Sequence, residues 1–174
     1  MSTHFPPCFA QNSLHVCDAP SSHLTKPLVF TVIFGTHRAE SCACGANKTI
    51  PSAIGVDAFA KGDTIPSLVA SGNSPISTSD VVATVDKLPF DDGFADTVIA
   101  RHIFEHVIDP VIHLKEWARV IRPGGRLIIA VPDEEICASI PLNPEHVHAY
   151  TQKSLGNLIA GILPNFKLLH SQKS

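Results

Sequence analysis

The chain has 174 residues, which is the length of a single globular domain. Its 44% hydrophobic and 17% charged residues are enough to build a core, which excludes a disordered, collagen-like or coiled-coil protein. The formal net charge is −3 with no block of like charges, so the chain lacks the electrostatic footprint of a protein that binds nucleic acid or an anionic membrane.

The front of the chain contains few signals of regular structure. Prolines and Ser/Thr/Asn clusters interrupt it, and these residues favour turns over long helices. Two short runs rich in β-branched and aromatic residues predict strands, at residues 28–34 and 53–56. We predict a poorly defined N-terminal segment, residues 1–40, followed by one α/β domain, residues 41–174.

The back half gives clearer patterns. Apolar runs predict strands, and an apolar stripe that follows the N-cap pair Asp109–Pro110 predicts a helix over residues 110–121. Pro123 and the two glycines after it end that helix, and Thr151 caps a second helix that extends to about residue 161. The predicted strands of this half are residues 81–85, 97–100, 126–131 and 166–169. No clear seventh strand follows.

This order of elements, with near-continuously apolar strands, predicts an α/β fold with a mostly parallel sheet. No apolar run approaches the roughly 18 residues of a membrane-spanning helix, and the N-terminus lacks a signal-peptide pattern. The five cysteines include no C-x-x-C pair, which favours free thiols. We therefore expect a cytoplasmic protein without a membrane span.

In an open parallel sheet, ligands bind beyond the carboxyl ends of the strands. Asp57, Asp86 and the pair Arg101–His102 directly follow predicted strands. An acidic residue after a second strand often accepts hydrogen bonds from both ribose hydroxyls, so Asp57 predicts either a nucleotide site or a simple turn cap.

A segment of small residues, 42–47, precedes Asp57 and contains Cys44 and Gly45. Small residues let the backbone approach a ligand closely. Ala43 stands where a G-x-G loop has its other glycine, so these residues alone favour a tight turn with buried thiols.

Several motifs together carry a resemblance to a known family. They are Leu-Pro-Phe at residues 88–90, Glu-His-Val at 105–107, Arg-Pro-Gly-Gly at 122–125 and Asn-Pro-Glu-His-Val at 143–147. In this order and at these separations, the chain resembles the class I S-adenosylmethionine-dependent methyltransferases. The match extends over about residues 42–170 and is to the methyltransferase type 11 group, which includes small-molecule methyltransferases.

The resemblance implies a Rossmann-like sheet with helices on both faces, trimmed at its N-terminal part, and S-adenosylmethionine as cofactor. It implies the following cofactor contacts: methionine at Cys44 and Gly45, ribose at Asp57, adenine at Val85 and Asp86, and the sulfonium at Arg101 and His102.

Methyl transfer to a small-molecule or lipid-like acceptor requires alignment of the reacting atoms, and a base can assist by taking a proton. His106 and His146 are the candidate catalytic residues because histidine titrates near neutral pH. The alternative for His106 is a hydrogen bond that fixes its loop. The family's usual acidic residue and first glycine fall on Ser41 and Ala43, so the alternative function is a non-catalytic binding module.

A metal protein is a third hypothesis, because the chain has ten histidines. The spacing of His102 from His106 fits one helical face, and His146 and His148 form a second pair. Glu105 is misplaced for the H-E-x-x-H arrangement, and the cysteines lack zinc-finger spacing. We therefore expect no metal.

Overall fold

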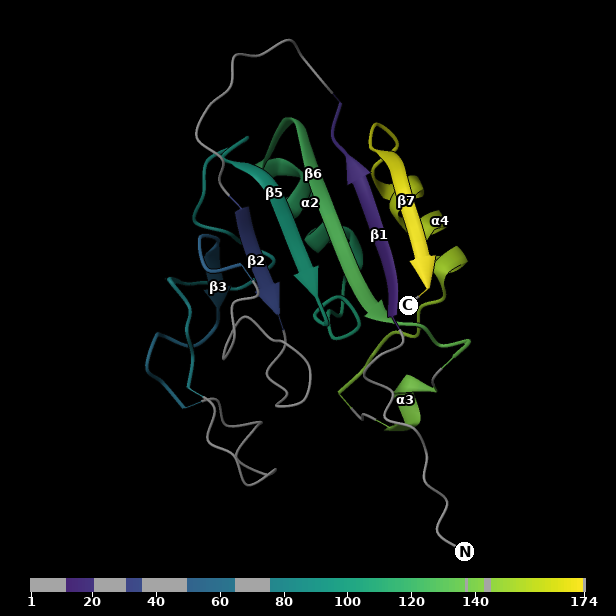
Figure 1. Ribbon diagram of the computed structural model, residues 1–174, viewed down its shortest axis with the longest axis horizontal. Helices are drawn as coiled ribbons and strands as arrows, with labels where there is room; N and C mark the ends of the chain where they lie inside the picture. The colour runs from purple at the N-terminus through teal and green to yellow at the C-terminus, as the bar shows by residue number, and fades with distance from the viewer. Residues whose placement is uncertain are drawn as a thin grey trace, which may run out of the picture.

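The computed structural model describes residues 12–20, 31–35, 50–64, 76–136, 138–142 and 145–173. Seven strands in these residues form one sheet in the order β4-β3-β2-β5-β6-β1-β7 (Figure 1). The strands are β1 Asn12–Asp18, β2 Thr31–Gly35, β3 Ile54–Asp57, β4 Val81–Val82, β5 Ala95–Arg101, β6 Ile121–Pro132 and β7 Lys167–Lys173. The pairs β3–β4, β2–β3, β2–β5 and β5–β6 are parallel, which confirms the predicted α/β class.

The N-terminal strand β1 supplies the seventh strand that the sequence did not predict. It lies between β6 and β7 and runs antiparallel to both, with Val16 opposite Ile128 on one side and His170 on the other. Its signal was weak because half of its alternating pattern is polar. The buried side chains are His15 and Cys17, whereas Val16 is only half-buried.

Three helices lie in the described residues: α2 Pro110–Val120, α3 Ser139–Leu142 and α4 Gln152–Ile162. The predicted helices over 110–121 and from Thr151 are confirmed as α2 and α4. The Asp109 carboxylate accepts hydrogen bonds from the amides of Val111 and Ile112, as an N-cap should. None of these helices combines the length and apolar character that crossing a membrane requires.

The core lies between the sheet and the helices α2 and α4. Both helices lie behind the sheet in Figure 1. Their buried side chains Leu114, Trp117 and Leu155 pack with Val98 of β5 and Leu127 of β6 in one apolar cluster. Helices of the described residues thus cover one face, and helices on the other face stay a prediction from the resemblance.

The parallel strands β2, β3, β5 and β6 all point toward the lower edge of the sheet in Figure 1. The loops that follow these strands therefore meet at one edge. Two glycines near the start of β6 allow the chain to bend and pack closely there. Gly124 has a φ of 75°, and a Cβ on Gly125 would lie 2.7 Å from the Asp96 carbonyl oxygen. The edge formed by the strand ends is where the candidate site lies.

Candidate functional site

Asp57 is the last residue of β3 and is buried, with 4% of its surface exposed. Its Oδ1 accepts a hydrogen bond from the Phe59 amide at 3.2 Å. The hydroxyls of Ser77 and Ser79 donate to the Phe59 carbonyl at 3.0 and 2.6 Å. The loop after β3 is thus held in place, and with it the Asp57 carboxylate.

The loop after β4 is held by helix α2. The indole Nε1 of Trp117 donates to the Val85 carbonyl at 2.8 Å, and Glu116 accepts from the Leu88 amide at 2.7 Å. Asp86 is exposed, and its pKa is lowered mainly by a hydrogen bond from the Thr84 side chain. Asp86 is therefore an available carboxylate at the end of this loop.

These two loops and the segment after β5 enclose a cavity of about 500 Å³, called here the strand-end cavity. Such a volume suits a small molecule or a cofactor. The lining residues are Val56, Asp57, Ala58, Ala83, Thr84, Val85, Asp86, Ile103, His106, Val107, Ile108, Asp109, Ile112 and His113.

The structure therefore brings four of the predicted site residues together at this cavity: Asp57, Val85, Asp86 and His106. The sequence did not single out the apolar lining residues Ile103 and Ile112. Their signal was present only in part, as apolar positions beside the Glu-His-Val motif and on the first turns of α2. Cys44 and Gly45 lie outside the described residues.

Arg101 and His102 are not among the residues that line the cavity. His102 has a φ of 49°, and its amide donates to the Ala130 carbonyl at 2.9 Å. Its ring is buried, and Nδ1 lies 3.3 Å from Oε1 of Glu105. Arg101 is half-buried at the end of β5. The chain reversal at His102 thus directs this ring to Glu105.

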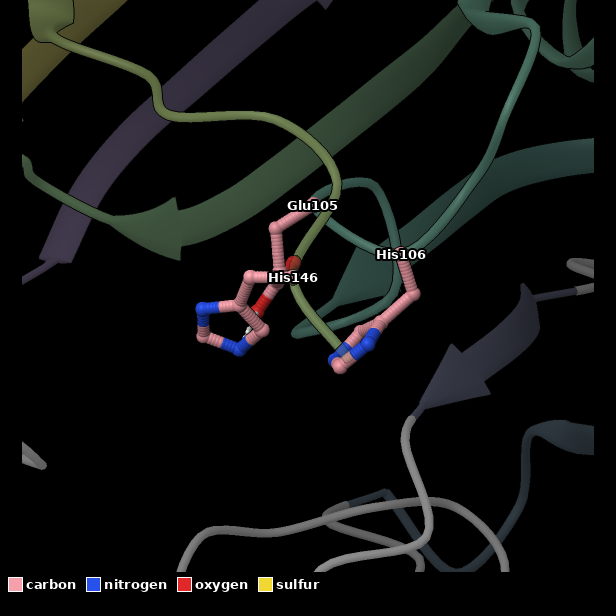
Figure 2. A group of neighbouring side chains, drawn as sticks. All are labelled: Glu105, His106 and His146. Atoms are coloured by element: carbon pink, nitrogen blue, oxygen red, sulfur yellow. Dashed lines mark ion pairs between the residues drawn. The ribbon is translucent and has the colours of Figure 1, made fainter. Parts of the chain in front are cut away.

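A cluster of three side chains, called here the Glu–His cluster, lies beside the cavity and consists of Glu105, His106 and His146. Figure 2 shows them extending from two different loops into one region. One potential ligand atom from each lies within 4.8 Å of those of the others. His146 Nε2 lies 4.0 Å from Oε1 of Glu105, and the two imidazole rings meet edge-on with centroids 4.7 Å apart.

Backbone hydrogen bonds join the two loops of this cluster. The Glu105 carbonyl accepts from the amides of Val147 and His148, the two residues that follow His146, at 2.9 and 3.2 Å. His106 Nδ1 lies 3.0 Å from the Glu145 carbonyl oxygen. A carbonyl only accepts, so Nδ1 is the donor in this contact and Nε2 is the ring nitrogen left for another partner. The hydrogen bond expected to fix the His106 loop is thus present, and it leaves Nε2 available.

An aromatic wall backs the Glu–His cluster. Tyr150 is buried and stacks on Phe104 with ring centroids 5.3 Å apart, and Phe104 in turn contacts Trp117. Burial, with Glu105 nearby, raises the pKa of Tyr150 well above its usual range, so the phenol stays neutral. No sequence pattern marks Tyr150 as a site residue, because it comes near Glu105 only in the folded chain.

Comparison with known proteins shows which family this chain matches. The family described as "Methyltransferase domain" matches residues 42–129. A demethylmenaquinone methyltransferase from Mycolicibacterium gilvum is 45% identical over 49 residues, which are 28% of this chain and 22% of that protein. A probable S-adenosylmethionine-dependent methyltransferase from Mycobacterium tuberculosis is 29% identical over 80 residues, 44% of this chain and 29% of that protein. The chain thus spans less than a third of these curated relatives.

Among solved structures, a SAM-dependent methyltransferase from Thermotoga maritima superposes with a TM-score of 0.55 at 20% identity. The superposition covers 79% of this chain and 64% of that one. At this identity the likeness concerns the fold alone, and it agrees with the α/β sheet described above.

Proposed function

Because the chain belongs to the class I S-adenosylmethionine-dependent methyltransferases, we propose that it transfers a methyl group from S-adenosylmethionine to a small-molecule or lipid-like acceptor. The observation that carries the proposal is the strand-end cavity, where Asp57, Val85, Asp86 and His106 meet. When bound, the cofactor supplies a methyl group on a positively charged sulfur, which is a good leaving group.

The cavity residues fit the adenosine part of this cofactor. The buried Asp57 carboxylate would accept hydrogen bonds from the ribose hydroxyls. Val56, Ile103 and Ile112 provide apolar walls for a flat base, and the exposed Asp86 carboxylate would accept from its amino group. We keep Cys44 and Gly45 as the proposed methionine contacts.

We retain Arg101 and His102 as proposed residues near the sulfonium only in a secondary role. Neither lines the cavity, and the His102 ring contacts Glu105 instead. Their proposed role is to shape the loop between β5 and α2, from which Glu105 and His106 extend.

His106 is the proposed proton acceptor, with His146 as its neighbour. The Nδ1 hydrogen bond to the Glu145 carbonyl orients the His106 ring, so that Nε2 can take a proton from a hydroxyl acceptor. His146 lies 4.0 Å from the buried Glu105 carboxylate, which would stabilise a protonated imidazole there. These contacts support a catalytic role for both histidines.

The rim of the cavity favours an apolar acceptor. Ile108 and Ile112 line the cavity and are 86% and 52% exposed, and Val147 on the neighbouring loop is 49% exposed. Exposed apolar residues at a pocket mouth suit an apolar ligand. One relative is named a demethylmenaquinone methyltransferase, which motivates quinols as the first acceptors to assay. A cytoplasmic location stays a prediction from the sequence.

The alternative function is a non-catalytic binding module. Two measurements on the full chain distinguish it from a methyltransferase. The first is calorimetric titration with S-adenosylhomocysteine, for which we expect saturable micromolar binding. Asp57→Asn should weaken it by about 10-fold or more, because a charged hydrogen bond contributes roughly 1.5–3 kcal/mol. Asp63→Asn is the matched control, since the Asp63 carboxylate accepts a local hydrogen bond from the Ala60 amide and does not line the cavity.

The second measurement is transfer of a labelled methyl group to quinols and other hydroxylated aromatic compounds. Transfer that depends on His106 supports the enzyme. A folded protein that binds S-adenosylhomocysteine but methylates none of these acceptors favours the binding module, and the absence of any S-adenosylhomocysteine binding rejects the enzyme.

A further inference from the structure

We propose that Glu105, His106 and His146 form a binding site for a divalent transition-metal ion of the zinc type. The site goes beyond the proposed methyl transfer and does not depend on it, and in the metal-bound protein His106 Nε2 would hold the ion instead of accepting a proton. Two imidazole nitrogens and one carboxylate oxygen are the protein ligands of several catalytic zinc sites, which keep a further position open for water or substrate. His106 also lines the strand-end cavity, so the open position would face the space where an acceptor binds.

The spacing of the three groups is compatible with an ion between them. Their potential ligand atoms lie within 4.8 Å of one another. Around a zinc ion with bonds of about 2.0–2.2 Å, ligand atoms lie roughly 3–3.5 Å apart, so side-chain movements of about 1 Å would close the site. Each member is held by the backbone of short loops rather than by a long flexible segment, since the Glu105 carbonyl binds the Val147 and His148 amides.

Glu105 is the member that most requires a cation. It is 1% exposed, and His102 Nδ1 lies 3.3 Å from its Oε1. The second oxygen, Oε2, is buried and has no hydrogen-bond partner among the described residues. Buried carboxylates are costly unless they are paired or bind a metal. A metal ion beside this carboxylate would offset the cost of burying it, with His102 orienting the carboxylate.

The orientation of His106 is that of a metal-binding histidine. Such residues almost always donate their second ring proton to a carbonyl or carboxylate, which directs the other nitrogen at the metal. His106 does this through Nδ1 and the Glu145 carbonyl. The structure thus replaces the pairs that the sequence suggested. His102 is bonded to Glu105, and His148 Nε2 lies 3.3 Å from the Ile108 carbonyl, outside the cluster.

The test is zinc binding by the chelator-treated full chain. We expect Zn²⁺ to bind with one-to-one stoichiometry in a calorimetric titration, and Co²⁺ in its place to show visible absorption bands of a protein-bound ion. His106→Ala and His146→Ala should each weaken zinc binding by at least about 10-fold. His170→Ala is the control, because His170 is exposed on β7 and its ring contacts the Gln172 side chain, away from the Glu–His cluster.

Two results would overturn the proposal. One is zinc binding that is no tighter in the natural chain than in the His106→Ala, His146→Ala double variant. The other is an equal loss in His170→Ala, which would mean binding by scattered surface histidines. Glu105→Gln is the third variant, and if it does not fold the two histidine variants decide the outcome.

The same preparations separate this proposal from the proposed function. Zinc binding without S-adenosylhomocysteine binding would leave the metal site standing and reject the methyltransferase. S-adenosylhomocysteine binding with no zinc binding would do the reverse, because Asp57 and Val85 lie outside the Glu–His cluster.

Discussion

The indole nitrogen of Trp117 donates a hydrogen bond to the backbone carbonyl of Val85, 2.8 Å away. Trp117 is fully buried in the face of α2 that packs on the sheet, whereas Val85 lines the strand-end cavity. A core residue of the helix thus sets the position of a carbonyl in the ligand site. Stability and ligand binding should be coupled through this contact.

Trp117→Phe tests the coupling. Phenylalanine keeps an aromatic ring in the core but removes the donor, which leaves the Val85 carbonyl without this bond. We expect the free energy of unfolding in urea to fall by about 1–3 kcal/mol. Binding of S-adenosylhomocysteine should also weaken. A variant that loses stability but binds as tightly as the natural chain would contradict the coupling.

Stability should fall at alkaline pH because of two buried acids. Burial raises the pKa of the Cys17 thiol from 9.0 to about 11, and it raises the pKa of Tyr150 above its usual range. The folded state therefore binds these protons more tightly than the unfolded state. The stabilisation from the Cys17 thiol is complete below pH 9 and is lost as the pH rises toward 11. Where a group has lost its proton in the unfolded chain but keeps it in the folded chain, the free energy of unfolding falls by about 1.4 kcal/mol per pH unit.

The measurement is urea unfolding at a series of pH values from neutral to 11. Cys17→Ala should flatten the pH dependence between 9 and 11, where the thiol contributes. An unchanged slope in Cys17→Ala would mean that the buried thiol is not responsible.

Strand β1 should be essential to the sheet. Val16 lies between β6 and β7, so its backbone is hydrogen-bonded within the sheet rather than to water. Val16→Pro removes one backbone donor and strains the strand, and it should lower the free energy of unfolding by at least about 2 kcal/mol more than Val16→Ala. Equal effects of the two substitutions would show that β1 contributes through its side chain alone.

The capping box of α4 offers a double-mutant test. Thr151 Oγ1 accepts from the Ser154 amide at 3.1 Å, and the Thr151 amide donates to Ser154 Oγ at 2.9 Å. Thr151→Ala should cost about 0.5–2 kcal/mol of stability. Because the two side chains belong to one motif, the double variant with Ser154→Ala should lose less than the sum of the single losses. Strict additivity in urea unfolding would contradict reciprocal capping.

The sequence was sufficient to predict a helix boundary where one or two residues determine it. Asp109–Pro110 fixed the start of α2, because a carboxylate cap and a proline are favourable there and nowhere else in a helix. Parallel strands then bring their carboxyl ends to one edge, which is why Asp57 and Asp86 could be predicted to lie at one site from the sequence.

Interactions between distant loops could not be predicted. Glu105 and His146 are separated by many residues, and they meet because the Glu105 carbonyl binds the amides of Val147 and His148. No sequence period encodes such a contact. The side-chain direction of His102 could not be predicted either. His102 has a positive φ, and its ring contacts Glu105 instead of lining the cavity.

The position of β1 has a consequence for synthesis of the chain on the ribosome. This strand emerges before every other strand of the sheet, yet its partners come last, as the Asp18–Arg126 ion pair across 108 residues illustrates. Until β6 has been translated, β1 has neither of its partner strands, and unpaired strands are sites of misassociation. The step that completes the sheet is therefore delayed until translation has passed residue 173, however early the parallel strands assemble.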